Sequence, residues 1–421
     1  MSTIKKKNKD AVKSQAALLP SWLHALALSA VVFIGTLTYS NSFNCSFHFD
    51  DKQNIVNNSH LRNVSADDPY FSLSQSRLIG NLSFAFNYSY NGLNVRGYHF
   101  FNLIVHLLNA CLVYGLILLL FNTPELKKHP SFRHRAGIAL FAALIFVVHP
   151  LATQSVTYIV QRLASMVTLF YLSTIFFYLK GRLTDTSTFK RVAYFLLAGF
   201  MAILAFLTKE NSFTLPVALV LTEICFFQPQ LVAIDRKNYR LLAVLGILVA
   251  VVGVAVARFS TDVLRPIPPS FGHAYTLTPA TYLFTQFSVI VKYIQLLLVP
   301  VNQNLDYDFP LSYSLWEPRA LISLVILLSL LVLAIRIFKN HRLAAFGILW
   351  FFLTLAIESS IVPISDVIFE HRTYLPSFGF LLAVVSLGYT FFWTRKATAA
   401  VITVVLVVIT FSAMAYKRNK V

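Results

Sequence analysis

Two adjacent carboxylates, Asp50 and Asp51, lie in the stretch FHFDDKQNIVNN, a short way beyond the first apolar segment. Only 12% of the chain is charged, and its 17 acidic residues are outnumbered by 35 basic ones, so an acidic doublet is notable. Neighbouring acids raise one another's pKa, which suits a general base or half of a cation site. A lone carboxylate there would be an ordinary solvated charge. The doublet therefore predicts catalysis by Asp50 and Asp51, and leaves open whether they bind Mg²⁺ or Mn²⁺.

Further ionisable residues fall near the ends of apolar segments. Burying each one in a bilayer costs about 2.5–3.5 kcal/mol on insertion scales, so a set on one side of the membrane suggests a function. The set comprises Arg96, His99, His106, His149, Arg162, Lys209, Glu210, Glu370, His371 and Arg372.

Simpler interpretations apply to several of them. Arg96 and Arg162 lie beside span ends, where arginine commonly extends toward lipid headgroups. Lys209 and Glu210 are neighbours and could neutralise each other. A histidine before a proline, as at His149, could cap a broken helix. His106, inside a span, is expected to pack against other helices.

Taken together, the residue types suggest one kind of chemistry. A carboxylate can take a proton from an attacking hydroxyl, while arginine and lysine hold phosphate oxygens and stabilise a departing phosphate. These groups suit transfer from a phosphorylated lipid donor.

The elements that must position these residues are membrane helices. The chain has 421 residues, of which 57% are hydrophobic, and a mean hydropathy of +0.66. Since a span needs roughly 20 helical residues, we expect an all-α polytopic membrane protein forming a single domain over residues 1–421. We expect about eleven transmembrane helices, at 22–40, 98–121, 136–149, 163–180, 192–208, 212–228, 241–258, 319–338, 343–358, 375–393 and 398–416.

Charge and cysteine content narrow the class further. The net charge of +18 is spread over short connections rather than one stripe, which indicates membrane topology and not nucleic-acid binding. Cys45, Cys111 and Cys225 show no metal-type spacing, so we expect unpaired thiols.

The distribution of basic residues orients the first half of the chain. A cytoplasmic basic tail (1–21) places the first loop (41–97) outside, where we expect the acidic pair and short surface helices. The region 259–318 is expected to form external loops. The segment 281–300 carries Gln286, Lys292 and Gln295, and the residues alone do not decide whether it crosses the bilayer.

Six stretches, in order along the chain, resemble the GT-C membrane glycosyltransferases. They are similar to the branch of transmembrane and tetratricopeptide-repeat O-mannosyltransferases and their bacterial relatives. The stretches are FHFDDKQNIVNN, RGYHFFNLIVHLLNACLVYGLI, FVVHPLATQSVTYIVQRLASMVTLFYL, LTKENSFTLPVALVLTE, LLLVPVNQNLDYDFP and FEHRTYLPSFGFLL.

The resemblance implies an inverting enzyme that uses a polyprenyl-phosphate monosaccharide at the outer membrane face. Asp50 would be the base, Lys209 and Glu210 match a KE element, and Arg372 matches the arginine of an ER element, here with His371 inserted after Glu370. We expect 281–300 not to cross fully. The expected donor-phosphate ligands are Arg372, His371, Lys209, Arg162 and Arg96, and the supporting residues are Glu210, His149, His99 and Glu370.

The expected partners are the donor, membrane lipids and a hydroxyl acceptor on a protein or glycolipid. Many relatives continue into tetratricopeptide repeats where this sequence reads YKRNKV, so a separate protein is a candidate for acceptor selection. The expected membrane is a bacterial inner membrane with a periplasmic site, or the endoplasmic reticulum of a eukaryote.

The alternative function is transport or flipping of a polyprenyl-linked glycan, which intramembrane charges would also suit. The predicted clustering of charges at one face, without duplicated halves, favours the enzyme. The identity of the sugar and of the acceptor stays open.

Overall fold

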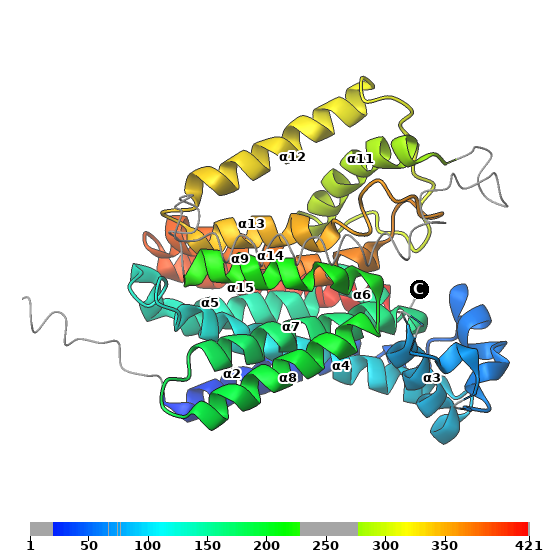
Figure 1. Cartoon of the computed structure of the whole chain (residues 1–421). Helices are drawn as coiled ribbons and strands as arrows, with labels where there is room; N and C mark the ends of the chain where they lie inside the picture. The colour runs from blue at the N-terminus through cyan, green and yellow to red at the C-terminus, as the bar shows by residue number, and fades with distance from the viewer. Residues whose placement is uncertain (1–19, 66, 74, 76, 228–276, 420–421) are drawn as a thin grey trace, which may run out of the picture.

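The computed structural model describes residues 20–65, 67–73, 75, 77–227 and 277–419, which form a bundle of α-helices with no β-strand among them. The helices run side by side across Figure 1, and the short helices of the first loop project from one end. We call this end of the bundle the first-loop end and the other the connector end. The longer helices are α2 (Ser21–Tyr39), α3 (Leu78–Asn91), α4 (Val95–Phe121), α5 (Arg135–Val148), α7 (Arg162–Arg182), α8 (Thr188–Phe206), α9 (Leu215–Phe226), α11 (Pro279–Leu298), α12 (Pro318–Ile337), α13 (Arg342–Leu355), α14 (Tyr374–Gly388) and α15 (Ala397–Arg418).

Local sequence explains where many helices begin. The Asn94 side chain accepts a hydrogen bond from the backbone of Arg96 at the start of α4, and Thr278 does the same for Thr281 in α11. Proline occupies the first turn of α11 and of α12, where its missing N–H costs no helical hydrogen bond.

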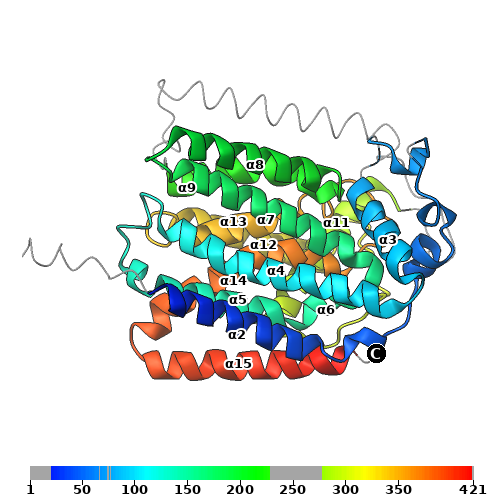
Figure 2. The same ribbon diagram turned by 90° about the horizontal axis from the view of Figure 1, so that it is seen from below.

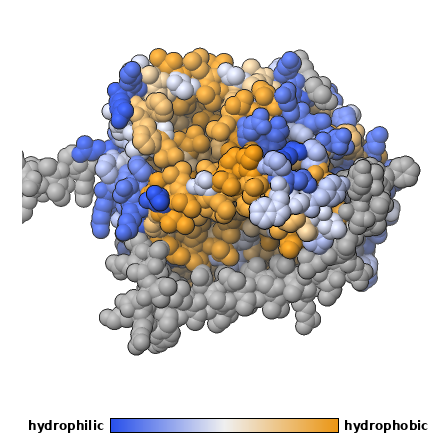
Figure 3. Space-filling model, turned by 90° about the horizontal axis from the view of Figure 1, so that it is seen from above, coloured by the Kyte–Doolittle hydropathy of each residue, from blue (hydrophilic) through white to orange (hydrophobic). Residues whose placement is uncertain are grey.

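The predicted all-α membrane fold is confirmed. Nine helices of the described part are long and apolar enough to cross a bilayer. Figure 3 shows an apolar band between two more polar ends of the molecule, as a bilayer requires. The predicted span 241–258 lies outside the described residues, and two other predicted spans correspond to the shorter helices α9 and α13.

The terminal helices pack against each other. Figure 2 shows α2 and α15 side by side along one edge, and the hydroxyls of Thr38 and Ser412 are 2.6 Å apart. The first loop contains short helical turns at Ser42–Asn44, Lys52–Val56, Ser59–Leu61 and Pro69–Phe71 together with α3, as expected.

A glycine contact brings α13 and α14 together. A Cβ built on Gly347 would lie 2.3 Å from the carbonyl oxygen of Gly379, and one on Gly379 would lie 2.6 Å from that of Gly347. Small residues at such a crossing let two membrane helices approach closely. The contact fixes the segment after α13 relative to the segment before α14, and both contribute to the site described below.

The contacts of α11 bear on the ambiguous segment 281–300. Near its beginning, the Tyr282 hydroxyl donates to the carbonyl of Glu358, and near its end the Leu297 carbonyl lies 3.1 Å from Nε2 of His149. Between these points the Tyr293 hydroxyl accepts from the backbone N–H of Phe369. All three partners lie at the first-loop end, although α11 also packs against Leu327 of α12 and Phe351 of α13.

Candidate functional site

A buried ion pair joins two distant segments at the first-loop end. Lys209 lies in extended backbone between α8 and a 3₁₀ turn, Glu210–Thr214, and its Nζ is 2.5 Å from Oε1 of Glu358. The two side chains are only 8% and 9% exposed. The other carboxylate oxygen of Glu358, Oε2, is buried without a hydrogen-bond partner in the described structure. An orphaned oxygen of this kind is costly, and such groups occur at functional sites.

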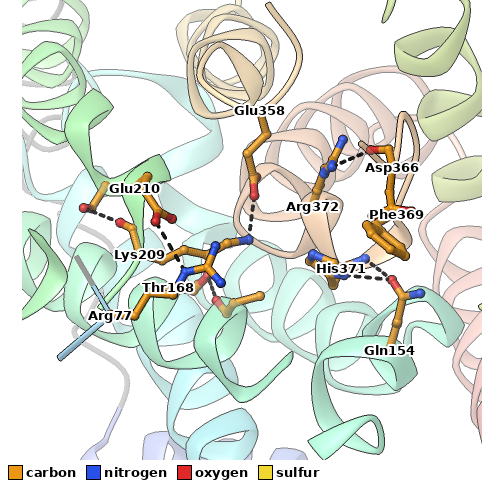
Figure 4. Close-up of polar contacts among 12 residues, drawn as sticks. Arg77, Gln154, Thr168, Lys209, Glu210, Glu358, Asp366, Phe369, His371 and Arg372 are labelled. Carbon is orange, nitrogen blue, oxygen red and sulfur yellow. Dashed lines mark hydrogen bonds and ion pairs between the residues drawn. The ribbon is translucent and has the colours of Figure 1, made fainter. Parts of the chain in front are cut away.

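His371 and Arg372 lie beside this pair, in the 3₁₀ turn Glu370–Thr373 that leads into α14 (Figure 4). The backbone N–H of His371 donates to Oε1 of Gln154 at 2.5 Å, and its Nδ1 is 3.2 Å from the same oxygen. Because an amide oxygen only accepts, Nδ1 carries the proton of a neutral ring. Its Nε2 is then a free acceptor, with no partner among the described residues.

Arg372 is buried but contacts only neutral groups within hydrogen-bonding distance. Its guanidinium donates to the carbonyl oxygens of Asp366 and Val367 and to the hydroxyl of Tyr282, and it lies over the ring of Phe369. Burying a cation without a bound counter-ion is expensive, so the position favours an anionic ligand.

A second, more exposed ion pair borders the cluster, where Nε of Arg77 lies 3.3 Å from Oε1 of Glu210. Figure 4 shows both pairs together with Arg372. Lys209, Arg77 and Arg372 supply three positive charges, and Glu358 and Glu210 supply two negative ones. Within the described residues, Arg372 has no carboxylate within hydrogen-bonding distance, whereas Lys209 and Arg77 each have one.

Glu370 organises the surroundings of the cluster from a fully buried position. Its carboxylate is 2.5 Å from Nη1 of Arg418 at the end of α15. It also accepts hydrogen bonds from the Tyr307 hydroxyl, the Asn304 backbone and the Gln303 amide. A carboxylate with this many donors is already satisfied, which fits the predicted supporting position of Glu370.

The acidic doublet is held in a strained turn of the first loop. Phe49 has φ of +42°, a left-handed value that bulky residues rarely adopt. After this turn Asp50 is exposed and Asp51 is buried. The turn therefore separates the two acids into different environments.

Asp51 is fixed by backbone donors. Its Oδ1 accepts from the N–H of Val160 at 2.7 Å, and its Oδ2 accepts from the N–H of His48 at 3.1 Å. Burial, with a smaller contribution from Asp50, raises the pKa of Asp51 to about 7, although backbone hydrogen bonds from His48, Val160 and Ile159 oppose the rise. Asp51 therefore holds the loop in place, and Asp50 is the more exposed of the two acids.

One segment, residues 149–162, contacts both the doublet and the cationic cluster. Gln154 binds His371, and Val160 binds Asp51. The Tyr158 hydroxyl accepts a hydrogen bond from the backbone of Asp50. His149 begins the segment, where its Nδ1 caps the backbone of Leu151, as the simpler interpretation of this residue expected. The acids and the cations are thus tied to the same short stretch of chain.

Three of the predicted residues lie apart from this arrangement. Arg162 is fully buried among the rings of Phe84 and Phe101, and its Nε donates to Asn102. Its other guanidinium nitrogens donate to the carbonyl oxygens of Ser83 and Tyr98, so Arg162 holds α3 and α4 together.

Arg96 and His99 contact the beginning of the first loop. Arg96 is exposed and donates to Asn44, while Nε2 of His99 lies 2.9 Å from the carbonyl oxygen of Cys45. Both residues position the loop that leads to the acidic doublet.

A divalent cation at the acidic doublet stays a prediction. The described residues contain no group of three or more His, Cys, Asp or Glu side chains that could hold an ion. Both oxygens of Asp51 already accept backbone hydrogen bonds. Mg²⁺ is commonly held by one or two carboxylates together with substrate phosphates, so Asp50 is the carboxylate of the doublet that could take part, and the reaction proposed below routes no step through a metal.

Sequence reasoning missed Glu358, Arg77 and Gln154. Glu358 follows an apolar segment directly and belongs to the stretch IESSIVPISD. An acid at the end of a predicted helix is therefore the feature by which the sequence could have indicated it. Arg77 and Gln154 gave no signal, because each depends on a partner more than a hundred residues away.

The fold and the cluster define an all-α polytopic membrane protein with a charged site at one end of its bundle. No family model and no solved structure matches the chain. It is similar to the Protein O-mannosyl-transferase F38B6.6 of Caenorhabditis elegans, with 26% identity over 387 residues, covering 84% of this chain and 50% of the relative. Similarity extends to Protein O-mannosyl-transferase tmtc2 of Xenopus laevis (25% over 339 residues; 74% and 39%) and human TMTC4 (28% over 229 residues; 49% and 29%).

These relatives confirm the predicted resemblance to the O-mannosyltransferases. The chain spans half or less of the length of these curated relatives.

Proposed function

We propose that the protein is an inverting glycosyltransferase. It moves one monosaccharide, mannose, from a polyprenyl phosphate to a hydroxyl group of a protein. The observation that carries the proposal is the cluster of Lys209, Glu358, His371 and Arg372, linked through residues 149–162 to the acidic doublet. The names of the relatives supply the sugar and the protein acceptor.

In the proposed reaction, Asp50 takes the proton of the acceptor hydroxyl while the oxygen of that hydroxyl attacks the anomeric carbon of the sugar. The bond from that carbon to the phosphate oxygen breaks, and the polyprenyl phosphate leaves with the electron pair. Arg372 and Lys209 stabilise the charge that develops on the phosphate. Attack from the side opposite the leaving phosphate inverts the anomeric centre.

The site faces outward in this proposal, toward the periplasm in a bacterium or the lumen of the endoplasmic reticulum in a eukaryote. The gathering of charged groups at one end of the bundle supports an enzyme over a flippase, which would need them near the middle of the bilayer.

The test is single-turnover transfer from polyprenyl-phosphate mannose to a Ser/Thr-rich peptide by the full chain in one detergent. Asp50→Asn keeps the shape of the side chain but removes its basicity, so transfer should fall by about 10²–10⁴-fold while donor binding is retained. Asp185→Asn is the matched control, since Asp185 is an exposed acid at the connector end. Transfer by Asp50→Asn at the wild-type rate would refute the role of Asp50 as the catalytic base.

A further inference from the structure

A lateral groove of about 580 Å³ runs between α5, α14, α15 and the end of α11, and Lys209, Glu358 and Arg372 are not among the described residues that line it. Its walls are aliphatic and aromatic, and no Asp or Glu is among the described residues that line it. The volume falls within the range of about 300–1,000 Å³ that is typical of ligand sites. In Figure 2, α15 runs along the lower edge and α5 lies further in, above α2 in that view.

Two glycines on different helices keep this groove open. Gly137 of α5 and Gly388 of α14 both line it, and a Cβ built on either one meets no atom within 4 Å. A larger side chain at either position would therefore project into open space. Immediately after Gly388 the helix widens into a π-helical turn, Tyr389–Trp393, a feature that is frequent at functional sites.

The mouth of the groove is basic and lies at the connector end. Arg133 and His134 precede α5, and Lys396 precedes α15. Neither Arg133 nor Lys396 has an ion-pair partner in the described part of the chain. The His134 ring lies 5.1 Å from that of Tyr389 and 6.0 Å from that of Trp393, measured between centroids. Basic side chains beside Tyr and Trp are expected where a membrane helix reaches the lipid headgroups.

We propose that the groove binds one anionic glycerophospholipid, with its headgroup at Arg133, His134 and Lys396 and an acyl chain between α5, α14 and α15. Charge complementarity selects the occupant: the basic mouth suits an anionic headgroup, and the apolar walls suit an acyl chain. The connector end carries the basic loops, so the positive-inside rule places this mouth in the cytoplasmic leaflet, where anionic lipids concentrate.

The tail of a polyprenyl donor is the competing occupant. The donor phosphate of the proposed reaction would lie at the opposite end of the bundle, beside Lys209 and Arg372. A tail descending from there would bring only hydrocarbon to the three basic side chains, leaving them without an anion. The charged mouth therefore favours a lipid that enters from the connector end.

The experiment uses native mass spectrometry of the full chain in detergent, with dioleoyl phosphatidylglycerol and, as the neutral comparison, dioleoyl phosphatidylcholine. We expect one phosphatidylglycerol to be retained at least tenfold better than phosphatidylcholine. Arg133→Gln combined with Lys396→Gln should abolish this preference. Gly388→Leu should weaken retention of both lipids, because its side chain projects into the groove.

Matched controls separate the site from general lipid contact. Gly199→Leu introduces the same side chain at another glycine with open space, on the exposed surface of α8. Lys190→Gln combined with Arg191→Gln removes two exposed cations outside the groove. Both controls should retain phosphatidylglycerol as the wild type does.

Three results would overturn the proposal: equal retention of the two lipids, retention unaffected by Gly388→Leu, or loss in the Gly199→Leu control. A polyprenyl phosphate that displaces phosphatidylglycerol from the wild type but does not bind Gly388→Leu would assign the groove to the donor tail instead. None of these readouts depends on transfer activity, so the proposed function stands or fails separately.

Discussion

At the scale of single residues, Lys209 has two potential anionic partners, Glu358 and a donor phosphate. The Glu358 carboxylate holds Nζ at 2.5 Å in a buried position, so it competes with the phosphate for the same ammonium group. Lys209→Gln should weaken donor binding about tenfold or more, since a charged hydrogen bond is lost. Glu358→Gln should leave donor affinity unchanged or raise it.

Equilibrium donor binding by both variants, in one detergent, checks this competition. Thermal unfolding should accompany it, because Glu358→Gln leaves a buried lysine without its counter-ion and lowers stability. If Glu358→Gln weakens donor binding as much as Lys209→Gln, the carboxylate itself contacts the donor and the competition does not exist.

Asp51 gives a prediction on pH. Its pKa is raised from 3.8 to about 7 by burial, so between these values the folded chain holds a proton that the unfolded chain releases. The folded state then binds more protons, and stability falls as pH rises through this window, by at most about 4 kcal/mol at 1.4 kcal/mol per unit. Unfolding midpoints from pH 5 to 8 should fall for the wild type and change less for Asp51→Asn. If the unfolding midpoint depends on pH equally in the wild type and in Asp51→Asn, the raised pKa of Asp51 is contradicted.

Residue types predicted much of the candidate site, and geometry supplied the rest. The KE and ER elements and the acidic doublet could be recognised because each is a local string of letters. Glu358 and Gln154 could not, since their roles come from contacts with Lys209 and His371 across the fold. The burial of Arg162 was equally invisible, because it depends on rings contributed by α3 and α4.

At the scale of elements, Glu370 ties the end of α15 and the loop after α11 to the turn that carries Arg372. Glu370→Gln keeps the size of the side chain but leaves Arg418 without its carboxylate, which should cost about 3–5 kcal/mol. The loss should appear in thermal unfolding and as faster proteolysis of the loop after α11, which Glu370 also holds. A double variant with Arg418→Gln should be less destabilised than the sum of the two single variants.

The control for this prediction is Arg77→Gln, which breaks a pair with side chains 52% and 37% exposed. Exposed pairs contribute about 0–1 kcal/mol, so its unfolding midpoint should hardly change. A Glu370→Gln variant as stable as this control would mean that the Arg418 contact contributes nothing to the fold.

Helix positions were the part of the fold that sequence predicted best. The span predicted at 98–121 corresponds to α4 (Val95–Phe121), and that at 398–416 corresponds to α15 (Ala397–Arg418). Hydropathy suffices for such segments because a bilayer-length apolar run has one stable conformation. It did not decide the case of 281–300, since a helix lying against polar loops and a helix crossing lipid share the same periodicity.

At the scale of the whole molecule, the orientation of the second half depends on α11. Both of its ends contact residues at the first-loop end, Glu358 and His149. If α11 returns to the side it entered from, α12 starts outside and α15 ends outside. The prediction of eleven spans, which includes 241–258, then places the chain end on the same side as Asp50.

Reporter fusions test this orientation directly. A reporter after Val421 should be outside the cytoplasm and one within 339–342 should be inside. Residues 339–342 join α12 to α13, so they lie on the opposite side of the membrane from α11 and from the loop containing Glu358. A reporter at Thr186, in the short connection between α7 and α8, is the internal control and should be cytoplasmic. A cytoplasmic reporter after Val421 would mean that α11 crosses the bilayer. In that case Lys209 and Arg372, which the fold holds at one end of the bundle, could not both face the side that the positive-inside rule gives to Asp50.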